Sequence, residues 1–281
     1  MASCRPLIPV DGPGGGGFPD YGVPLVGISN GAFFAAATGN KFALTGNFSG
    51  ESDRGGNRLT VVGGTNYDYG FTADDITTAV QDGSKGRTLQ NIGGSFYNDG
   101  NNFALVNQSN DTLSTATCAT PYKMSTTGAF VGQKDLKTAG PAGMSDIFAV
   151  TVSDGGSHVY VSDASQNLFH YETATPYDFT ALVYQSRIDN SSGIPYDITI
   201  TPDGKYLLAS IPNATFQVLR FELATPFALS SAGAGVQINL SAAIAGQALS
   251  LIRGIQIDIW RQTAYASFDS TNRIYQIDWT G

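Results

Sequence analysis

Residues 146–177 read DIFAVTVSDGGSHVYVSDASQNLFHYETATPY, and residues 196–227 read YDITITPDGKYLLASIPNATFQVLRFELATPF. Both stretches contain three runs of β-branched, Leu and aromatic residues, with a turn of Asp and Gly between the first two runs. Both close with Ala-Thr-Pro followed by an aromatic residue. Apolar runs bounded by turn residues predict strands, and a repeated set of them predicts one supersecondary unit that has been copied.

Three more copies of the unit can be placed along the chain. In the first copy, the expected features are strands at 32–37 and 41–45 around a turn at 38–40, a third strand at 59–62 and a closing segment at 71–79. The second copy covers residues 95–132, and the fifth covers residues 255–279 and has no fourth strand. The copies recur about every 50 residues with about four strands each, which is typical of propeller blades rather than of solenoids.

The sequence therefore predicts an all-β fold, a β-propeller of five blades with four antiparallel strands each. Residues 23–29 read as a strand with no partner nearby, and the last copy lacks an outer strand. If this N-terminal strand completes the last blade, the ring closes and no sheet edge is left exposed. We expect one propeller domain over residues 23–281.

The N-terminal residues 1–22 differ from the rest of the chain. Leu7, Ile8 and Val10 form a short apolar patch, and the glycines 14–17 follow it as a flexible linker. Two interpretations stay open: a disordered leader, or an arm whose apolar tip docks on another subunit of an assembly. We expect no secretory signal here, because residues 1–10 lack a long apolar core.

Composition excludes several classes of partner. The 281 residues include 34 glycines, only 14% are charged, and the formal net charge is −8. Binding to nucleic acid requires clustered Lys and Arg, whereas the 15 basic residues of this chain are scattered. No apolar run approaches the roughly 20 residues that span a membrane. We expect neither nucleic acid binding nor membrane insertion.

Five-bladed propellers include glycosidases, which need two carboxylates facing each other about 5–10 Å apart. The expected first strands supply Asp146, Asp197 and Asp258. Asp146 and Asp197 start equivalent strands of two copies, and a position shared between copies is explained first by structure. A carbohydrate-contacting rim of Tyr196, Asp197 and Arg253 is the alternative that remains open, so these three are the candidate ligand-binding residues.

Signals for metals and cofactors are weak. His158 and His170 are separated by 12 residues without the acidic or Cys pattern of a ligand set, and we expect both to be strand surface residues. The Asp-Gly turns lack the acidic density of a calcium loop. We therefore expect no metal, no cofactor and no catalytic residue.

The Asp-Gly turn, the aromatic strand and the closing segment at 174–181 resemble the propeller repeat of structural proteins of tailed bacteriophages, in which each repeat ends in a Thr-Pro-aromatic segment. The segment 221–227, FELATPF, is the nearest match. The resemblance covers residues 95–240, while copies one and five lack the Thr-Pro-aromatic signature.

This resemblance implies a non-enzymatic component of a virion, either a head decoration or a tail-associated protein. It implies capsid or tail proteins as partners and many copies on one particle, with Leu7, Ile8 and Val10 as the candidate docking residues. A lectin-like adhesin that binds a host surface glycan is the alternative, and a five-bladed glycoside hydrolase is a further one.

Overall fold

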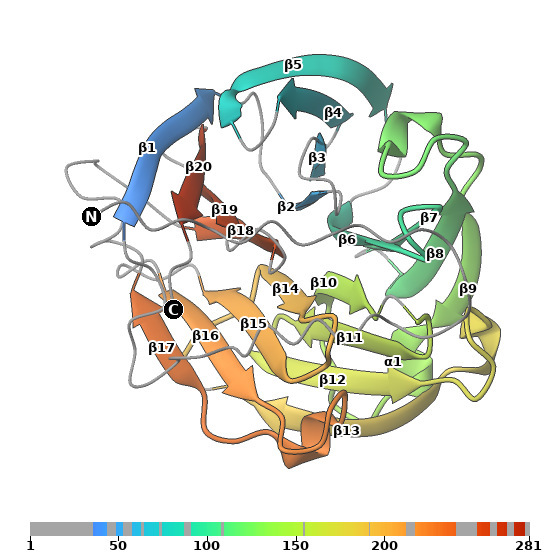
Figure 1. The fold of residues 1–281 in the computed structure, drawn as a ribbon. Helices are drawn as coiled ribbons and strands as arrows, with labels where there is room; N and C mark the ends of the chain where they lie inside the picture. The colour runs from blue at the N-terminus through green and yellow to red at the C-terminus, as the bar shows by residue number, and fades with distance from the viewer. Residues whose placement is uncertain are drawn as a thin grey trace, which may run out of the picture.

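The computed structural model describes residues 36–43, 49–52, 58–62, 65–72, 75–86, 91–107, 110–153, 155–190, 192–211, 217–239, 252–258, 263–268 and 273–278, and side chains are described from residue 94 to residue 238. Nearly all of its regular structure is β-strand (Figure 1). The strands are β1 (Ala36–Ala43), β2 (Ser49–Ser52), β3 (Arg58–Val62), β4 (Thr65–Thr72), β5 (Asp75–Gly86), β6 (Asn91–Tyr97), β7 (Asn102–Asn107), β8 (Thr112–Thr117), β9 (Val131–Asp135), β10 (Ile147–Val152), β11 (His158–Asp163), β12 (Asn167–Glu172), β13 (Val183–Asp189), β14 (Asp197–Ile200), β15 (Tyr206–Ile211), β16 (Gln217–Glu222), β17 (Val236–Asn239), β18 (Ile252–Asp258), β19 (Thr263–Phe268) and β20 (Arg273–Asp278).

The strands pair into four-stranded antiparallel sheets, and most sheets consist of strands consecutive in sequence. These sheets are β2-β3-β4-β5, β6-β7-β8-β9, β10-β11-β12-β13 and β14-β15-β16-β17. The strands β18, β19 and β20 form a sheet whose fourth strand is β1, from the other end of the chain. The prediction of an all-β fold of four-stranded antiparallel sheets is confirmed.

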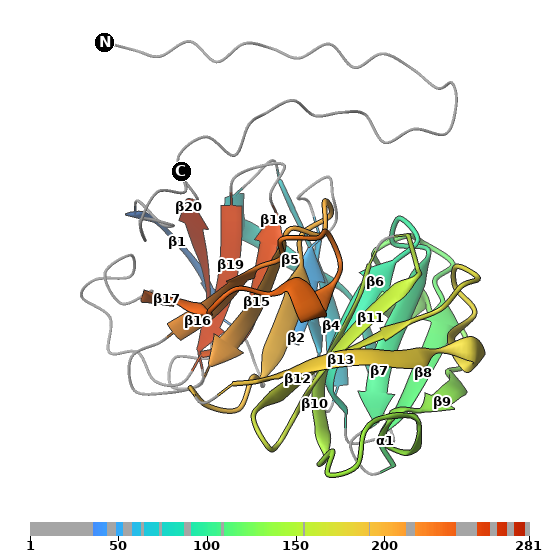
Figure 2. The same ribbon diagram turned by 90° about the horizontal axis from the view of Figure 1, so that it is seen from below.

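The sheets surround a common centre. In Figure 1 the first strand of each sheet lies nearest the centre, and the outer strands β1, β5, β9, β13 and β17 lie at the periphery. Neighbouring first strands contact each other in the order β2, β6, β10, β14 and β18, and β18 contacts β2. From the side, β6–β9 and the sheet that contains β1 and β20 stand at opposite flanks of the molecule (Figure 2).

The core lies between the faces of neighbouring sheets. One cluster joins Ala104 and Val106 of β7 to Val150 and Val159 of the next sheet. A second cluster continues from that sheet to β14–β17. The second strand of each of these sheets is buried on both faces, whereas β13 at the periphery alternates between exposed and partly buried residues. The continuous apolar runs of the sequence are therefore the middle strands of the sheets.

The strand β1 corrects what the sequence predicts for the beginning of the chain. The predicted turn at 38–40 is wrong, because residues 36–43 form one strand that pairs with β20 through a register shift between Ala37 and Lys41. The first four-stranded sheet instead begins with β2. The outer place in the last sheet, which we expected residues 23–29 to fill, belongs to β1. Residues 23–29 themselves lie outside the described residues, as do Leu7, Ile8, Val10 and the rest of residues 1–22.

The repeated Thr-Pro-aromatic segment has a structural role that we call the aromatic clasp. In three successive sheets, the ring of Tyr122, Tyr177 or Phe227 covers a glycine in the turn after the first strand. These glycines are Gly100, Gly156 and Gly204, and a Cβ atom on any of them would overlap the ring. The backbone N–H of the aromatic residue also donates to the carbonyl of the same glycine, at 2.9, 3.0 and 2.8 Å.

Each clasp depends on an uncommon backbone conformation. The aromatic residues have φ of 55°, 67° and 64°, and their partner glycines have φ of 75°, 70° and 70°. A left-handed conformation costs a residue with a side chain roughly 1–2 kcal/mol, so the packing of the ring offsets a local penalty. Each clasp is followed by a 3-10 turn whose first residue is buried: Met124, Phe179 or Leu229. The clasp thus ties the first turn of a sheet to the connection before its outer strand.

Candidate functional site

The first strands of neighbouring sheets begin at the same end of the molecule, which we call the axial end. The clasps lie at the opposite end, beside the turns that follow these strands, and we call this the clasp end. The serine at the fifth position of each second strand shows which residues of the first strands are equivalent. Ser162 pairs with Ala149, Ser210 with Asp197, and Ser267 with Gly254.

The residues that directly precede Ala149, Asp197 and Gly254 are therefore equivalent too, and they are Phe148, Tyr196 and Arg253. Phe148 and Arg253 each fall in a register shift of their strand, and such bulges re-aim a side chain. The structure describes only the backbone of Arg253. Two of the three predicted ligand-binding residues, Tyr196 and Arg253, therefore occupy one repeated position, and Phe148 is the equivalent residue that sequence reasoning missed.

Phe148 and Tyr196 contact each other across two sheets. Their ring centroids are 5.2 Å apart and the ring planes are inclined by 59°. Both side chains are only partly buried, although Phe148 lies on β10 and Tyr196 directly precedes β14, two of the strands nearest the centre. Together they form a partly exposed aromatic pair at the axial end, between β10 and β14.

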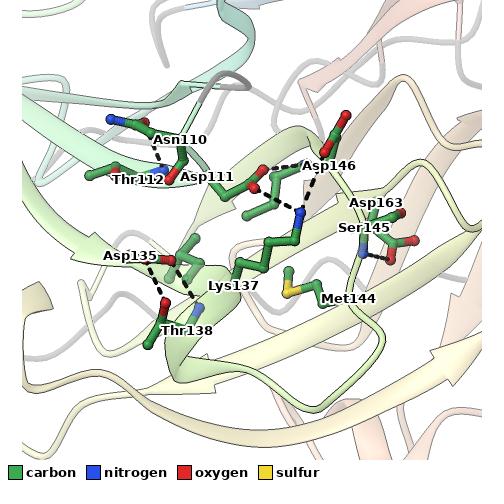
Figure 3. A network of polar contacts seen from close by, with 12 residues as sticks. Asn110, Asp111, Thr112, Asp135, Lys137, Thr138, Met144, Ser145, Asp146 and Asp163 are labelled. Atoms are coloured by element: carbon green, nitrogen blue, oxygen red, sulfur yellow. Dashed lines mark hydrogen bonds and ion pairs between the residues drawn. The ribbon is translucent and has the colours of Figure 1, made fainter.

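A network of polar contacts fixes the backbone before Phe148 (Figure 3). The buried Asp111 accepts a hydrogen bond from the backbone N–H of Ile147 at 3.0 Å. Its other oxygen lies 3.3 Å from the Nζ of Lys137, which is also 3.5 Å from Asp146. The hydrogen bond and charge of Asp111 raise the pKa of Lys137, so the ammonium group stays charged.

Asp163 fixes the same segment from the other side. It has no exposed surface and accepts hydrogen bonds from the backbone N–H groups of Ser145, Ser165 and Asn167 at 3.1, 3.0 and 2.9 Å. The backbone carbonyl of Asp146 in turn accepts from Ala164 at 2.8 Å. Two buried carboxylates, Asp111 and Asp163, thus hold the start of β10.

Tyr196 is positioned by the neighbouring sheet. The hydroxyl of the buried Ser162 donates to the carbonyl of Pro195 at 2.8 Å and accepts from the N–H of Ala149 at 3.1 Å. The N–H of Tyr196 donates to the carbonyl of Ser210 at 3.0 Å. Ser162 therefore links the backbones next to both aromatic residues, which sets the spacing of the pair.

Asp197, the third predicted ligand-binding residue, is the first residue of β14. Its side chain is buried, with 4% of the residue exposed, and its Oδ1 accepts from the N–H of Ile198 at 3.0 Å. The structure thus places Asp197 next to Tyr196 in the chain and gives its carboxylate a backbone partner, while Tyr196 is the more accessible of the two residues.

The two histidines form a cluster that the sequence analysis missed. The prediction that both are surface residues is wrong for His170, which is 3% exposed. The Nδ1 of His158 and the Nε2 of His170 lie 3.1 Å apart, and the ring of Tyr160 stacks on His170 with centroids 4.8 Å apart. Burial, and to a smaller extent the nearby His158, lower the pKa of His170 to about 4.

This cluster joins two sheets at the clasp end. Phe227, the clasp residue of the next sheet, stacks on His158 with centroids 4.9 Å apart and planes 6° apart. The hydroxyl of Tyr160 donates to the carbonyl of Phe227 at 2.6 Å. These contacts of the histidine cluster hold the two neighbouring sheets together.

Within the described residues, no three His, Cys, Asp or Glu side chains gather as a metal site. The same part of the chain contains no helix with the length and apolar character of a membrane span.

Comparison with known proteins shows the fold. No protein-family model matches the sequence, and no curated protein is significantly similar to it. Among solved structures, glutaminyl cyclase of Myxococcus xanthus is similar with a TM-score of 0.58 and 11% identity, over 86% of this chain and 96% of that one. A chain of a nidogen/laminin complex is similar with a TM-score of 0.51 and 11% identity, over 83% of this chain and 76% of that one.

The chain is a β-propeller. The β-propeller domain of Cps50 (Swd1) from Myceliophteria thermophila is a further similar structure, with a TM-score of 0.49 and 12% identity over 83% of this chain and 84% of that one. At such identities the similarity concerns the fold alone. The function of this propeller has to be argued from its own residues.

Proposed function

We propose that this propeller is a non-enzymatic structural component of a tailed-phage virion, present in many copies as a head decoration or a tail-associated protein. The observation that carries the proposal is the aromatic clasp. The segments that resemble phage propeller repeats, at Tyr122, Tyr177 and Phe227, perform one construction role in three successive sheets. A repeated motif with a structural role supports the proposal that the protein is a structural component of a particle, built from copied blades.

We further propose that the ring has five blades and closes through the pairing of the two ends of the chain. The pairing of β1 with β20 and the contact of β18 with β2 support this. Such a ring leaves no first strand without a neighbour on each side. A closed sheet ring also protects edges that would otherwise pair with other chains, which suits a protein crowded on a particle.

The carboxylates at the axial end support a structural role over hydrolysis. Asp111 and Asp163 hold backbone N–H groups, and Asp197 accepts from the N–H of Ile198. Asp146 is paired with Lys137. A glycosidase needs one protonated and one ionised carboxyl group aimed at a sugar between them. If Asp197→Asn removed a hydrolytic activity of the protein on polysaccharides, the hydrolase alternative would replace our proposal.

Mass spectrometry of purified particles tests the virion role. The sample is a tailed phage whose genome encodes this chain, purified by density gradient and compared with the free protein of the same lysate. We expect the chain in the particle band, with a copy number well above one per particle. Its presence only in the soluble fraction would contradict the proposal.

The arm is tested separately by deleting residues 1–20. If Leu7, Ile8 and Val10 dock on the particle, the deleted protein keeps a folded propeller and is lost from particles. Replacing the same three residues by Ser provides the matched control for chain length. Normal incorporation of both variants would show that the propeller is anchored by another surface.

A second candidate function is supported by the aromatic pair. Phe148 and Tyr196 are partly exposed and held rigidly at the axial end, which is the arrangement that carbohydrate-binding sites use for sugar rings. A virion propeller with such a site would act as a lectin-like adhesin. Binding to immobilised glycans distinguishes this adhesin from an inert decoration.

A further inference from the structure

We infer that the axial end binds a neutral sugar residue, with Phe148 and Tyr196 as its apolar platform and Asp146 and Lys137 as its polar contacts. The inference rests on the second candidate function, the adhesin, and gives it a site and a class of ligand. It adds Phe148, Asp146 and Lys137 to the predicted rim.

The aromatic pair supplies the apolar half of the site. A pyranose ring presents a face of C–H groups, which packs on aromatic rings as other apolar surfaces do. The two rings are inclined by 59°, so they form the floor and one wall of an angular platform rather than a flat surface. Their partial exposure leaves area that a sugar ring would cover.

The charged pair supplies the polar half. Asp146 stands two residues before Phe148, at the entrance to β10, and its side chain is 59% exposed. Lys137 is 44% exposed and lies 3.5 Å from Asp146. A carboxylate accepts hydrogen bonds and an ammonium group donates them, so a neighbouring pair of both suits two vicinal hydroxyl groups. Because Lys137 is shared with the buried Asp111, the group of Asp111, Asp146 and Lys137 carries one net negative charge, which favours a neutral ligand over an anionic one.

The site is preorganised, which lowers the cost of binding. Asp111 holds both Lys137 and the N–H of Ile147, and Asp163 holds the N–H of Ser145 (Figure 3). Little backbone freedom then remains to be lost when a ligand binds. One such site gives weak binding, but many copies on one particle would raise the overall avidity without further contacts.

The residues at the repeated position differ between sheets, so only a part of the axial end offers aromatic rings to a sugar. The position of Phe148 and Tyr196 carries Arg253 in the next sheet, so the aromatic platform covers only a part of the ring of first strands. The clasp end carries aromatic residues as well, but there each ring is packed on a glycine of its own sheet. The axial pair is therefore the better candidate for a sugar platform.

The test is isothermal titration calorimetry of the full chain with cello-, manno- and N-acetylglucosamine oligosaccharides, and with oligogalacturonate as the acidic counterpart. We expect at least one neutral series to bind and oligogalacturonate to bind more weakly. Phe148→Ala and Tyr196→Ala should each weaken binding at least about five-fold, the loss expected for one stacking contact. Lys137→Gln should weaken it too, without changing which series binds.

The control variant is Tyr184→Ala, which removes a partly buried tyrosine from the outer strand β13 and should leave affinity unchanged. Tyr196→Phe keeps the ring and should retain binding, which separates stacking from misfolding. The inference is overturned if no neutral series binds at millimolar concentration, or if binding survives in the Phe148→Ala, Tyr196→Ala double variant. The particle measurement above does not depend on either result, so failure of the site leaves the virion role standing.

Discussion

The two ends of the propeller differ in what they repeat. At the clasp end, Tyr122, Tyr177 and Phe227 perform the same task in successive sheets, with similar backbone angles and the same hydrogen bond to a glycine. At the axial end, the equivalent positions carry three different residues, Phe148, Tyr196 and Arg253. Uniform residues mark where the copied unit is built, and varied residues mark where one copy can acquire a function of its own.

The largest expected effect comes from breaking a clasp. Gly156→Ala places a Cβ in the ring of Tyr177 and requires alanine at a φ of 70°. The left-handed conformation costs about 1–2 kcal/mol and the displaced ring about 1–3 more, so we expect about 2–5 kcal/mol of lost stability. Urea denaturation measures this loss.

The neighbouring glycine provides the control for the clasp. Gly155 has no heavy atom within 4 Å of a built Cβ and no left-handed φ, so Gly155→Ala should change stability by less than about 0.5 kcal/mol. Equal effects of the two variants would mean that the clasp does not stabilise the blade, and the contrast between the two ends would lose its basis.

A smaller loss is expected when the axial end is loosened. Asp163→Ala leaves the N–H groups of Ser145, Ser165 and the buried Asn167 without their acceptor, which we expect to cost about 2–3 kcal/mol. Because Ser145 leads into β10, sugar binding should weaken as well. Asp189→Ala, which removes a 70% exposed carboxylate paired with Arg187, should cost less than about 0.5 kcal/mol. Unchanged stability of the Asp163 variant would refute the role of this carboxylate.

A change limited to mildly acidic pH is expected in the pH dependence of stability. The pKa of His170 falls from its usual 6.5 to about 4 in the folded protein, so the unfolded chain binds more protons between these values. Stability from this group is therefore complete above about pH 6.5 and is lost as the pH falls towards 4, by roughly 3 kcal/mol. Thermal melting from pH 4 to 7 measures the loss.

His170→Gln isolates this contribution. Gln keeps a polar group beside His158 but has no proton to gain, so its stability should vary less with pH over the same window. A wild-type protein whose melting temperature is constant from pH 4 to 7 would contradict the buried pair. A rise in melting temperature on adding zinc at pH 7, absent from His170→Gln, would instead reveal a metal site made by the two histidines.

The middle of the chain could be predicted closely because its local signals agree. The second apolar run of the stretch 196–227 forms the strand Tyr206–Ile211, since an Asp-Gly turn and an unbroken apolar run define it. The beginning of the chain could not, because Gly39 and Asn40 have the composition of a turn and yet continue β1 through a register shift. Pairing with β20, which is remote in sequence, determines that strand.

The candidate site was partly predictable for the same reasons. The sequence suggests Tyr196 and Arg253 only as part of a possible carbohydrate-contacting rim, with no spacing that singles them out, and Phe148 stands inside an apolar run. Its equivalence was available in the constant offset from Ser162, Ser210 and Ser267, but only strand register shows that the offset matters. The clasp was recognised as a motif but not as a contact, because a left-handed Tyr is not an ordinary local preference.

The most direct test of this account is a crystal structure of the full chain grown with the neutral oligosaccharide that binds most tightly. We predict one sugar ring packed on Phe148 and Tyr196 at the axial end, with hydroxyl groups within hydrogen-bonding distance of Asp146 and Lys137. The clasps at the other end should be unchanged and without sugar. A sugar seated on Tyr177 or Phe227 at the clasp end would contradict the division between an end that builds the propeller and an end that binds.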